Sequence, residues 1–83
     1  MTLQQLKYVI SIADSGSLNA ASKNLYISQP SLSGSVKELE EEIGFELFHR
    51  SNRGVTITAR GEEFLNYARQ VCAQYDLLES RFV

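Results

Sequence analysis

The sequence is poor in the residues that build metal sites, disulfides and many catalytic centres. Its 83 residues include one cysteine, one histidine and one proline, and no tryptophan. Cys72 therefore has no partner for an internal disulfide, and together with His49 it falls short of the three or four ligands of a zinc site. The same shortage leaves no combination of nucleophile and base for catalysis. We expect no enzyme and, within this domain, no metal and no cofactor.

Long apolar runs are missing as well, and the N-terminus lacks a basic stretch followed by an apolar one. The sequence thus predicts neither a membrane span nor a signal peptide, and we expect a cytoplasmic protein. With 43% hydrophobic and 22% charged residues, the chain is suited to one folded core and is too short for two. A core of this size supplies about 3–5 kcal/mol, so burial against a second copy would be a natural addition.

Acidic residues slightly outnumber basic ones, and the formal net charge is −2. Taken alone, this charge argues against a nucleic-acid partner, because phosphate binding needs clustered Lys and Arg. The charges are unevenly spread, however. Four of the ten acids lie in Glu38 to Glu42, whereas residues 51–60 hold Arg53 and Arg60 and no acid, and Arg50 stands just before them. This local cationic segment is compatible with a small footprint on DNA.

Apolar residues at three- and four-residue intervals predict three short helices in the first half of the chain. The first spans about Leu3 to Ala13, the second follows Ser17 and ends near Tyr26, and the third opens at Gln29 and ends before Gly44. The second and third helices, joined by a tight connection, have the outline of a helix-turn-helix. The expected buried positions are Leu3, Leu6, Val9, Ile10 and Ala13 in the first helix, Leu18, Ala21 and Leu25 in the second, and Leu32, Val36, Leu39 and Ile43 in the third.

A small two-stranded wing is predicted next. β-favouring residues flank an Asn52-Arg53-Gly54 tip, with one strand ending near Arg50 and another beginning at Val55. Thr58 then caps a fourth helix that runs to the end of the chain. The fold class is therefore all-α with a small β-wing, a winged helix-turn-helix over residues 1–58 followed by a long linker or dimerisation helix over residues 59–83.

The fourth helix carries apolar residues at heptad spacing, which is typical of helix pairing. We expect its first turns, around Phe64 and Leu65, to pack on the domain itself, and the rest to pair with a second copy. The predicted dimer interface consists of Ala68, Val71, Cys72, Tyr75, Leu78 and Phe82.

The outer face of the third helix offers the candidate DNA contacts Gln29, Pro30, Ser33, Gly34 and Lys37. Gln can pair with adenine, Ser with several bases, and Pro can contact a thymine methyl group. Capping and solvation are the plainer roles for Gln and Ser at a helix start, and Lys37 is equally suited to a phosphate or to Glu41. Arg50 and Arg53 suit phosphates or a narrow minor groove. His49 receives no chemical role, and Cys72 is read as a small packing residue.

Together, these residues resemble the N-terminal domain of the LysR-type transcriptional regulators over essentially the whole chain. The resemblance is carried by Leu3 to Tyr8, Gly16 to Leu18, Ala21, Leu25, Ser28 to Ser33, Leu39-Glu40, Gly44, Leu47-Phe48, Arg50, Arg53-Gly54 and Thr58. It implies that Gln29, Pro30, Ser33 and Lys37 face the major groove, that Arg50 and Arg53 serve the wing, and that Ser17 and Ser31 lie near phosphates. It also implies a dimerising fourth helix and, in the intact protein, a further domain that binds a small-molecule effector.

The sequence departs from the family pattern at Gly34, where members usually carry Arg, at Ala20, often basic, and at Ser22, usually Ala. We expect sequence-specific binding of double-stranded DNA by a bacterial transcription regulator, as a dimer on an interrupted inverted repeat. With Gly34 in the third helix, we expect either a different half-site preference or heavier reliance on the wing and on DNA shape. A tetramer of the full-length protein and contact with RNA polymerase stay open. The alternative is a winged-helix module that docks another protein, which would show no steep salt dependence.

Overall fold

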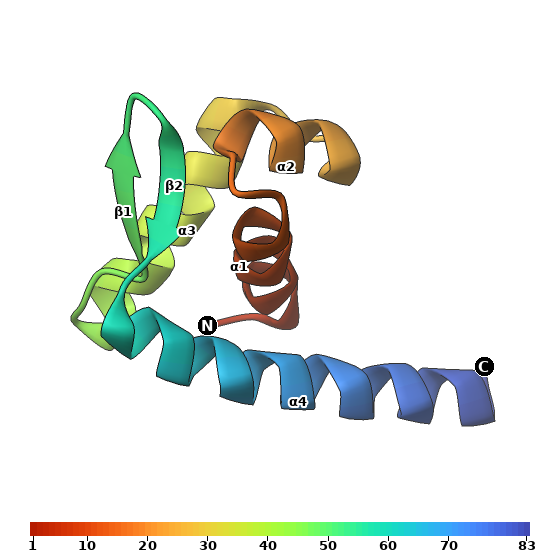
Figure 1. Ribbon diagram of the computed structural model, residues 1–83. Helices are drawn as coiled ribbons and strands as arrows, with labels where there is room; N and C mark the ends of the chain where they lie inside the picture. Colours follow the sequence, from red (N-terminus) through yellow and green to blue (C-terminus); the bar gives the residue numbers. More distant parts are fainter.

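The computed structural model describes residues 1–83 as four helices and one hairpin (Figure 1). In chain order the elements are α1 (Leu3–Ser15), α2 (Leu18–Leu25), α3 (Gln29–Ile43), β1 (Phe48–Ser51), β2 (Gly54–Ile57) and α4 (Ala59–Phe82). β1 and β2 pair antiparallel. The predicted winged helix-turn-helix is confirmed. None of the helices combines the length and the apolar character that crossing a membrane requires.

Hydroxyl side chains fix where the helices begin. The side chains of Ser17, Ser28 and Thr58 each accept a hydrogen bond from the backbone amide three residues later, at the starts of α2, α3 and α4. These bonds satisfy amides that have no partner inside the helix. α2 ends at Tyr26, a non-glycine residue with a left-handed backbone (φ 57°), so the chain turns sharply into α3. The backbone of Tyr26 and the cap at Ser28 therefore determine the turn between α2 and α3.

The core surrounds α1, which Figure 1 shows between the helix-turn-helix and α4. The main cluster of buried residues consists of Val9, Ile12, Ala21, Leu32, Val36, Leu39, Leu47, Phe48 and Leu65. The predicted stripe of α1 was partly wrong: Ile12 is fully buried, whereas Leu3, Ile10 and Ala13 are only half-buried. Because α1 contacts α2, α3, α4 and β2, its buried surface is wider than one stripe. In α3, Leu32, Val36 and Leu39 are buried as predicted, and Ile43 is half-buried.

The first half of α4 packs on α1 further than the sequence predicted. Ala68 and Cys72 are 2% and 8% exposed and form a second cluster with Leu6. This corrects their assignment to the dimer interface, because heptad spacing does not distinguish a neighbour in the same chain from a second copy. Burial raises the pKa of the Cys72 thiol, which fits a packing role. The part of α4 up to Cys72 therefore packs in the same core as the winged helix-turn-helix of residues 1–58.

An ion pair closes the same contact at the surface. Arg69 of α4 donates to Asp14 of α1 at 2.6 Å, and this hydrogen bond holds the pKa of the carboxyl below its usual value. Both side chains are about half exposed, so the pair adds little to the free energy of unfolding. It links α4 to the C-terminal end of α1.

Gly61 permits the close approach of α4 to the start of the wing. A Cβ atom at this position would lie 2.8 Å from Cγ1 of Ile57 and closer still to the carbonyl oxygen of Leu47. Thr58 secures the same junction, since its amide donates to the Leu47 carbonyl at 2.9 Å and its hydroxyl to the Glu46 carbonyl at 2.7 Å. A larger residue at position 61 would push helix and strand apart.

We predict that Gly61→Ala lowers the free energy of unfolding by about 1–3 kcal/mol, as overpacking does. Gly34→Ala is the matched control, because an added Cβ there meets nothing within 4 Å. That variant should raise stability by about 0.5–1 kcal/mol through helix propensity. Urea denaturation measures both changes. Equal stability of the two variants would contradict the packing described for Gly61.

Candidate nucleic-acid interface

The face of α3 turned away from the core carries the side chains that the sequence singled out. Gln29, Pro30, Ser31, Gly34 and Lys37 are exposed, and Ser33 is half-buried. The opposite face is closed in the core. This division follows from the helical spacing of the apolar residues, which leaves the polar N-terminal turns of α3 free for a ligand.

A surface hollow of about 210 Å³ joins the starts of α2 and α3 to the wing. Its lining includes Ser17, Gln29 and Arg50, three predicted site residues from separate parts of the chain. Arg53 lies beside the hollow in the exposed turn between the strands, and no side chain binds its guanidinium. The fold thus gathers the N-terminal ends of two helices, which favour negative charge, around one polar depression.

The side chain of Arg50 is not free in solvent but contacts two residues of α3. Its Nη1 donates to Oγ of Ser33 at 2.8 Å, and its Nη2 lies 4.0 Å from Oε1 of Glu40, so the guanidinium lies against α3. The sequence placed both Arg50 and Arg53 in the wing, and the structure has Arg50 in β1 and Arg53 in the turn that follows. Arg53 is at the wing tip, whereas the side chain of Arg50 reaches from β1 to α3.

Glu40 is the residue of this network that sequence reasoning missed. Its Oε2 accepts hydrogen bonds from the backbone amides of Leu47 at 2.6 Å and Phe48 at 3.4 Å, and its side chain is only 13% exposed. It therefore ties the start of β1 to α3. Within the acidic run Glu38 to Glu42, nothing in the sequence marks this carboxylate as different from its solvated neighbours.

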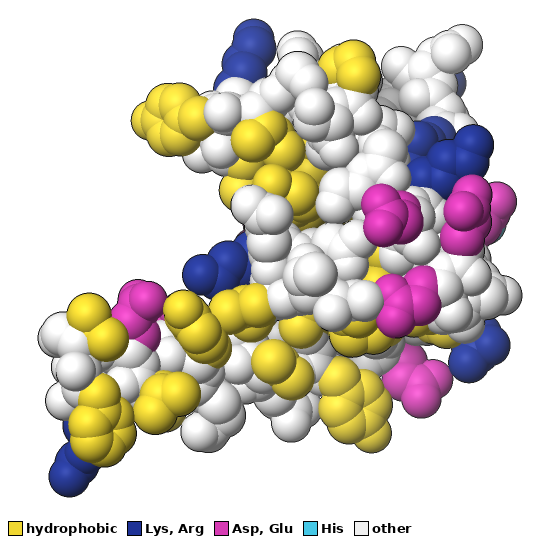
Figure 2. Space-filling model, turned by 180° about the vertical axis from the view of Figure 1, so that it is seen from behind, with side chains coloured by type: hydrophobic (Ala, Val, Ile, Leu, Met, Phe, Trp, Pro, Cys, Tyr) yellow, Lys and Arg dark blue, Asp and Glu magenta, His cyan; other side chains and the backbone are white.

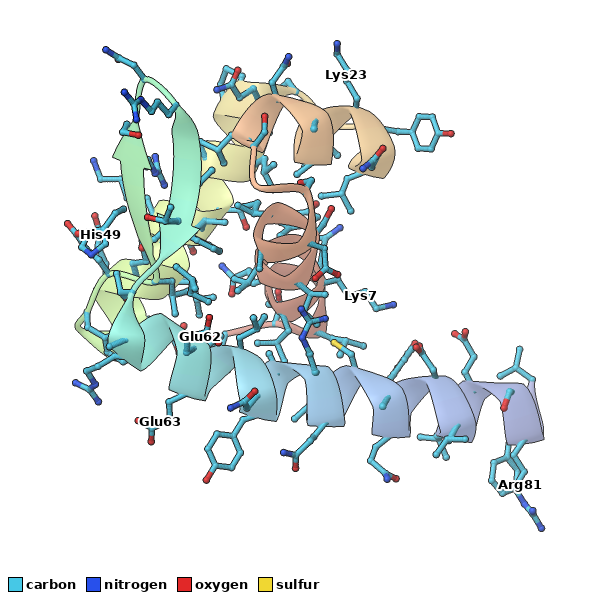
Figure 3. The ribbon with its side chains drawn as sticks, in the orientation of Figure 1. Lys7, Lys23, His49, Glu62, Glu63 and Arg81 are labelled. Carbon is cyan, nitrogen blue, oxygen red and sulfur yellow. The ribbon has the colours of Figure 1, made fainter.

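Lys37 and His49 lie on another depression, of about 430 Å³, between α3 and β1. Both are exposed, and Figure 3 shows His49 projecting from the outer side of the wing. The sequence left two roles open for Lys37, a phosphate contact or a pair with Glu41, and no ion pair links Lys37 to Glu41 in the structure. The Lys37 ammonium is therefore available for a phosphate.

Comparison with known proteins identifies the chain. Residues 3–62 match the family described as bacterial regulatory helix-turn-helix protein, lysR family. The chain belongs to the LysR family. This LysR-family domain is 44% identical over 73 residues to the HTH-type transcriptional regulator TfdT of Cupriavidus pinatubonensis, a match that covers 88% of the chain and 32% of TfdT. It thus spans about a third of the length of that relative.

Solved LysR-family structures share the fold. The crystal structure of a CbnR DBD–DNA complex has a TM-score of 0.92 at 38% identity, covering 98% of this chain and 93% of the other. A complex of the BenM DBD with benA site 1 DNA has a TM-score of 0.92 at 34% identity, with coverages of 98% and 91%. Both comparison structures contain DNA.

The wing of this LysR-family domain is fastened at Gly54. The amide of Val55 donates to the carbonyl of Gly16, between α1 and α2, at 3.2 Å. A Cβ on Gly54 would lie 2.7 Å from that carbonyl oxygen, and the backbone of Gly54 has φ 117°. Gly54 pairs with Ser51 at the first rung of the hairpin, so the turn is Asn52-Arg53 alone, one residue shorter than predicted.

We predict that Gly54→Ala releases the wing from Gly16, since the new Cβ collides with the carbonyl oxygen and is strained at positive φ. Amide hydrogen exchange at Val55 should accelerate by about tenfold or more, while Val9 in the core stays protected. Thr56→Ala, at an exposed position of the same strand, is the control. Unchanged exchange at Val55 would show that the wing is held elsewhere.

Proposed function

We propose that this chain binds double-stranded DNA sequence-specifically, with α3 in the major groove and the wing on phosphates or the minor groove. One observation carries the proposal: the start of α3 is exposed, and together with the start of α2 and the wing it surrounds one polar hollow. Helix-turn-helix proteins read base edges with the first residues of such a helix. Family membership and the DNA in the comparison structures of CbnR and BenM support the same conclusion.

The proposed contacts divide into two kinds. Gln29, Pro30, Ser33 and Gly34 face the bases, and Gly34 leaves open space there, since an added Cβ would meet nothing within 4 Å. Ser17, Ser31, Lys37 and Arg53 lie around them at positions suited to phosphate oxygens. Arg50, which the sequence grouped with these residues, lies against Ser33 of α3 and so borders the base-facing group. Phosphate contacts fix the register of the helix on DNA, and base contacts select the sequence.

We predict different effects for Gln29→Ala and Arg53→Ala. Loss of Gln29 should cost about 1–3 kcal/mol on duplexes selected from a random pool and little on random DNA, because it removes a base contact. Loss of Arg53 should weaken binding to all duplexes and reduce the slope of log K against log salt by about one. Fluorescence anisotropy across salt concentrations measures both. Wild-type protein that selects no sequence, or binds without salt dependence, would favour protein docking instead.

We propose further that two copies pair through the second half of α4. Val71, Tyr75, Leu78 and Phe82 are 49%, 38%, 59% and 74% exposed, and hydrophobic side chains gather along this helix in Figure 2. Such a row on a helix that leaves its own domain is a typical dimer contact. A dimer would present two copies of α3 to half-sites of an inverted repeat, about 34–36 Å apart or a multiple of it.

Leu78→Glu should convert the dimer into monomers, because it places a charge on the paired face. Leu77→Glu is the matched control: the neighbouring side chain is 62% exposed but lies off the heptad row. Sedimentation equilibrium distinguishes the two. If Leu78→Glu remains dimeric, the interface lies elsewhere.

We propose that this chain acts in regulation as one domain of a longer protein. Because the chain spans about a third of TfdT, we propose that an effector-binding domain accompanies it and changes how the paired α4 helices hold the two copies of α3. Tetramer formation and contact with RNA polymerase remain predictions for that longer protein.

A further inference from the structure

The two carboxylate oxygens of Glu40 have different partners, one in the wing backbone and the other in the side chain of Arg50. Oε2 binds the amides of Leu47 and Phe48, and Oε1 faces the guanidinium of Arg50 at 4.0 Å. The Glu40 side chain is 13% exposed and that of Arg50 is 40% exposed. The carboxylate is therefore held in place by the start of β1, and the guanidinium rests against a fixed negative charge.

Arg50 reaches from that charge to the recognition face. Its Nη1 donates to Oγ of Ser33, which lies one turn after Gln29 and Pro30 on α3. Ser33 uses an acceptor lone pair in this bond, so its hydroxyl proton is left to donate. The guanidinium has five N–H groups, of which Nη1 hydrogen-bonds Ser33, whereas Glu40 at 4.0 Å attracts the cation without a hydrogen bond. Together, Arg50 and Ser33 present hydrogen-bond donors to the surface.

We propose that Glu40 is a positioning residue for base readout. It holds Arg50 over Ser33, so that the two side chains read one base edge as a unit, and it does not itself touch DNA. The inference rests on the proposed DNA binding. Among base edges in the major groove, guanine offers two acceptors, O6 and N7, whereas adenine pairs an acceptor with a donor and cytosine offers a donor. Thymine offers a single acceptor, O4, beside its methyl group, so the two donors of Arg50 and Ser33 match guanine best.

Glu40→Gln tests the proposal because the amide keeps an oxygen for the Leu47 amide but loses the charge that holds Arg50. We expect the preference for guanine at one position of each half-site to fall about tenfold, measured by selection from random duplexes. Affinity for random DNA should hold or rise, since Arg50 is released toward phosphates and a negative charge is lost. Glu41→Gln, which removes the same charge from an exposed neighbour, should keep the wild-type preference.

Two further variants separate positioning from folding. Arg50→Lys leaves Glu40 and its bonds to β1 in place but lacks the planar fork, and it should lose the same guanine preference. In an Arg50→Met background, Glu40→Gln should cause no further change in the guanine preference. The proposal is overturned if Glu40→Gln or Arg50→Lys retains the wild-type sequence preference, or if the two effects add. Absence of any selected sequence for the wild type would instead refute the proposed DNA binding itself.

Discussion

The arrangement of this domain depends on the burial of α1 from several sides. Val9 and Ile12 are fully buried between the other helices, and Leu6 meets α4 on a further side. Because protein interiors are close-packed, a helix enclosed in this way cannot shift without moving everything that it contacts. At its end, the carbonyl of Gly16 receives the amide of Val55 from the wing. One short helix therefore sets the relative positions of α3, the wing and α4.

Two separate contacts hold the wing against the helices that form the proposed DNA-binding surface. The wing is bound to the turn before α2 through Val55, and its base is bound to α3 through Glu40. Two anchors at different heights leave a two-stranded hairpin little freedom to swing, although such a hairpin has marginal stability alone. The hollow lined by Ser17, Gln29 and Arg50 therefore depends on both anchors, which hold the wing beside the starts of α2 and α3.

Local signals in the sequence predicted most of the fold, and contacts between distant residues account for the errors. Hydroxyl caps such as Ser28 and the spacing of apolar residues locate the helices because both act within one turn. The same spacing could not show that Ile12 would be enclosed, or that Cys72 would pack on its own chain. The site shows the same division: exposure on α3 follows from its periodicity, whereas the bond between Ser33 and Arg50 joins residues seventeen positions apart that no local pattern relates.

The formal net charge of −2 is a poor guide to what DNA would meet, and the structure explains why. Glu40 is turned inward and shares its charge with two backbone amides and Arg50. Asp14 is paired with Arg69, on the side of α1 that faces α4. The N-terminal ends of α2 and α3 contribute positive potential at the hollow, and the exposed cation of Arg53 lies beside it. Electrostatic attraction at close range follows the local arrangement of charges, because salt screens those more than about 10 Å away.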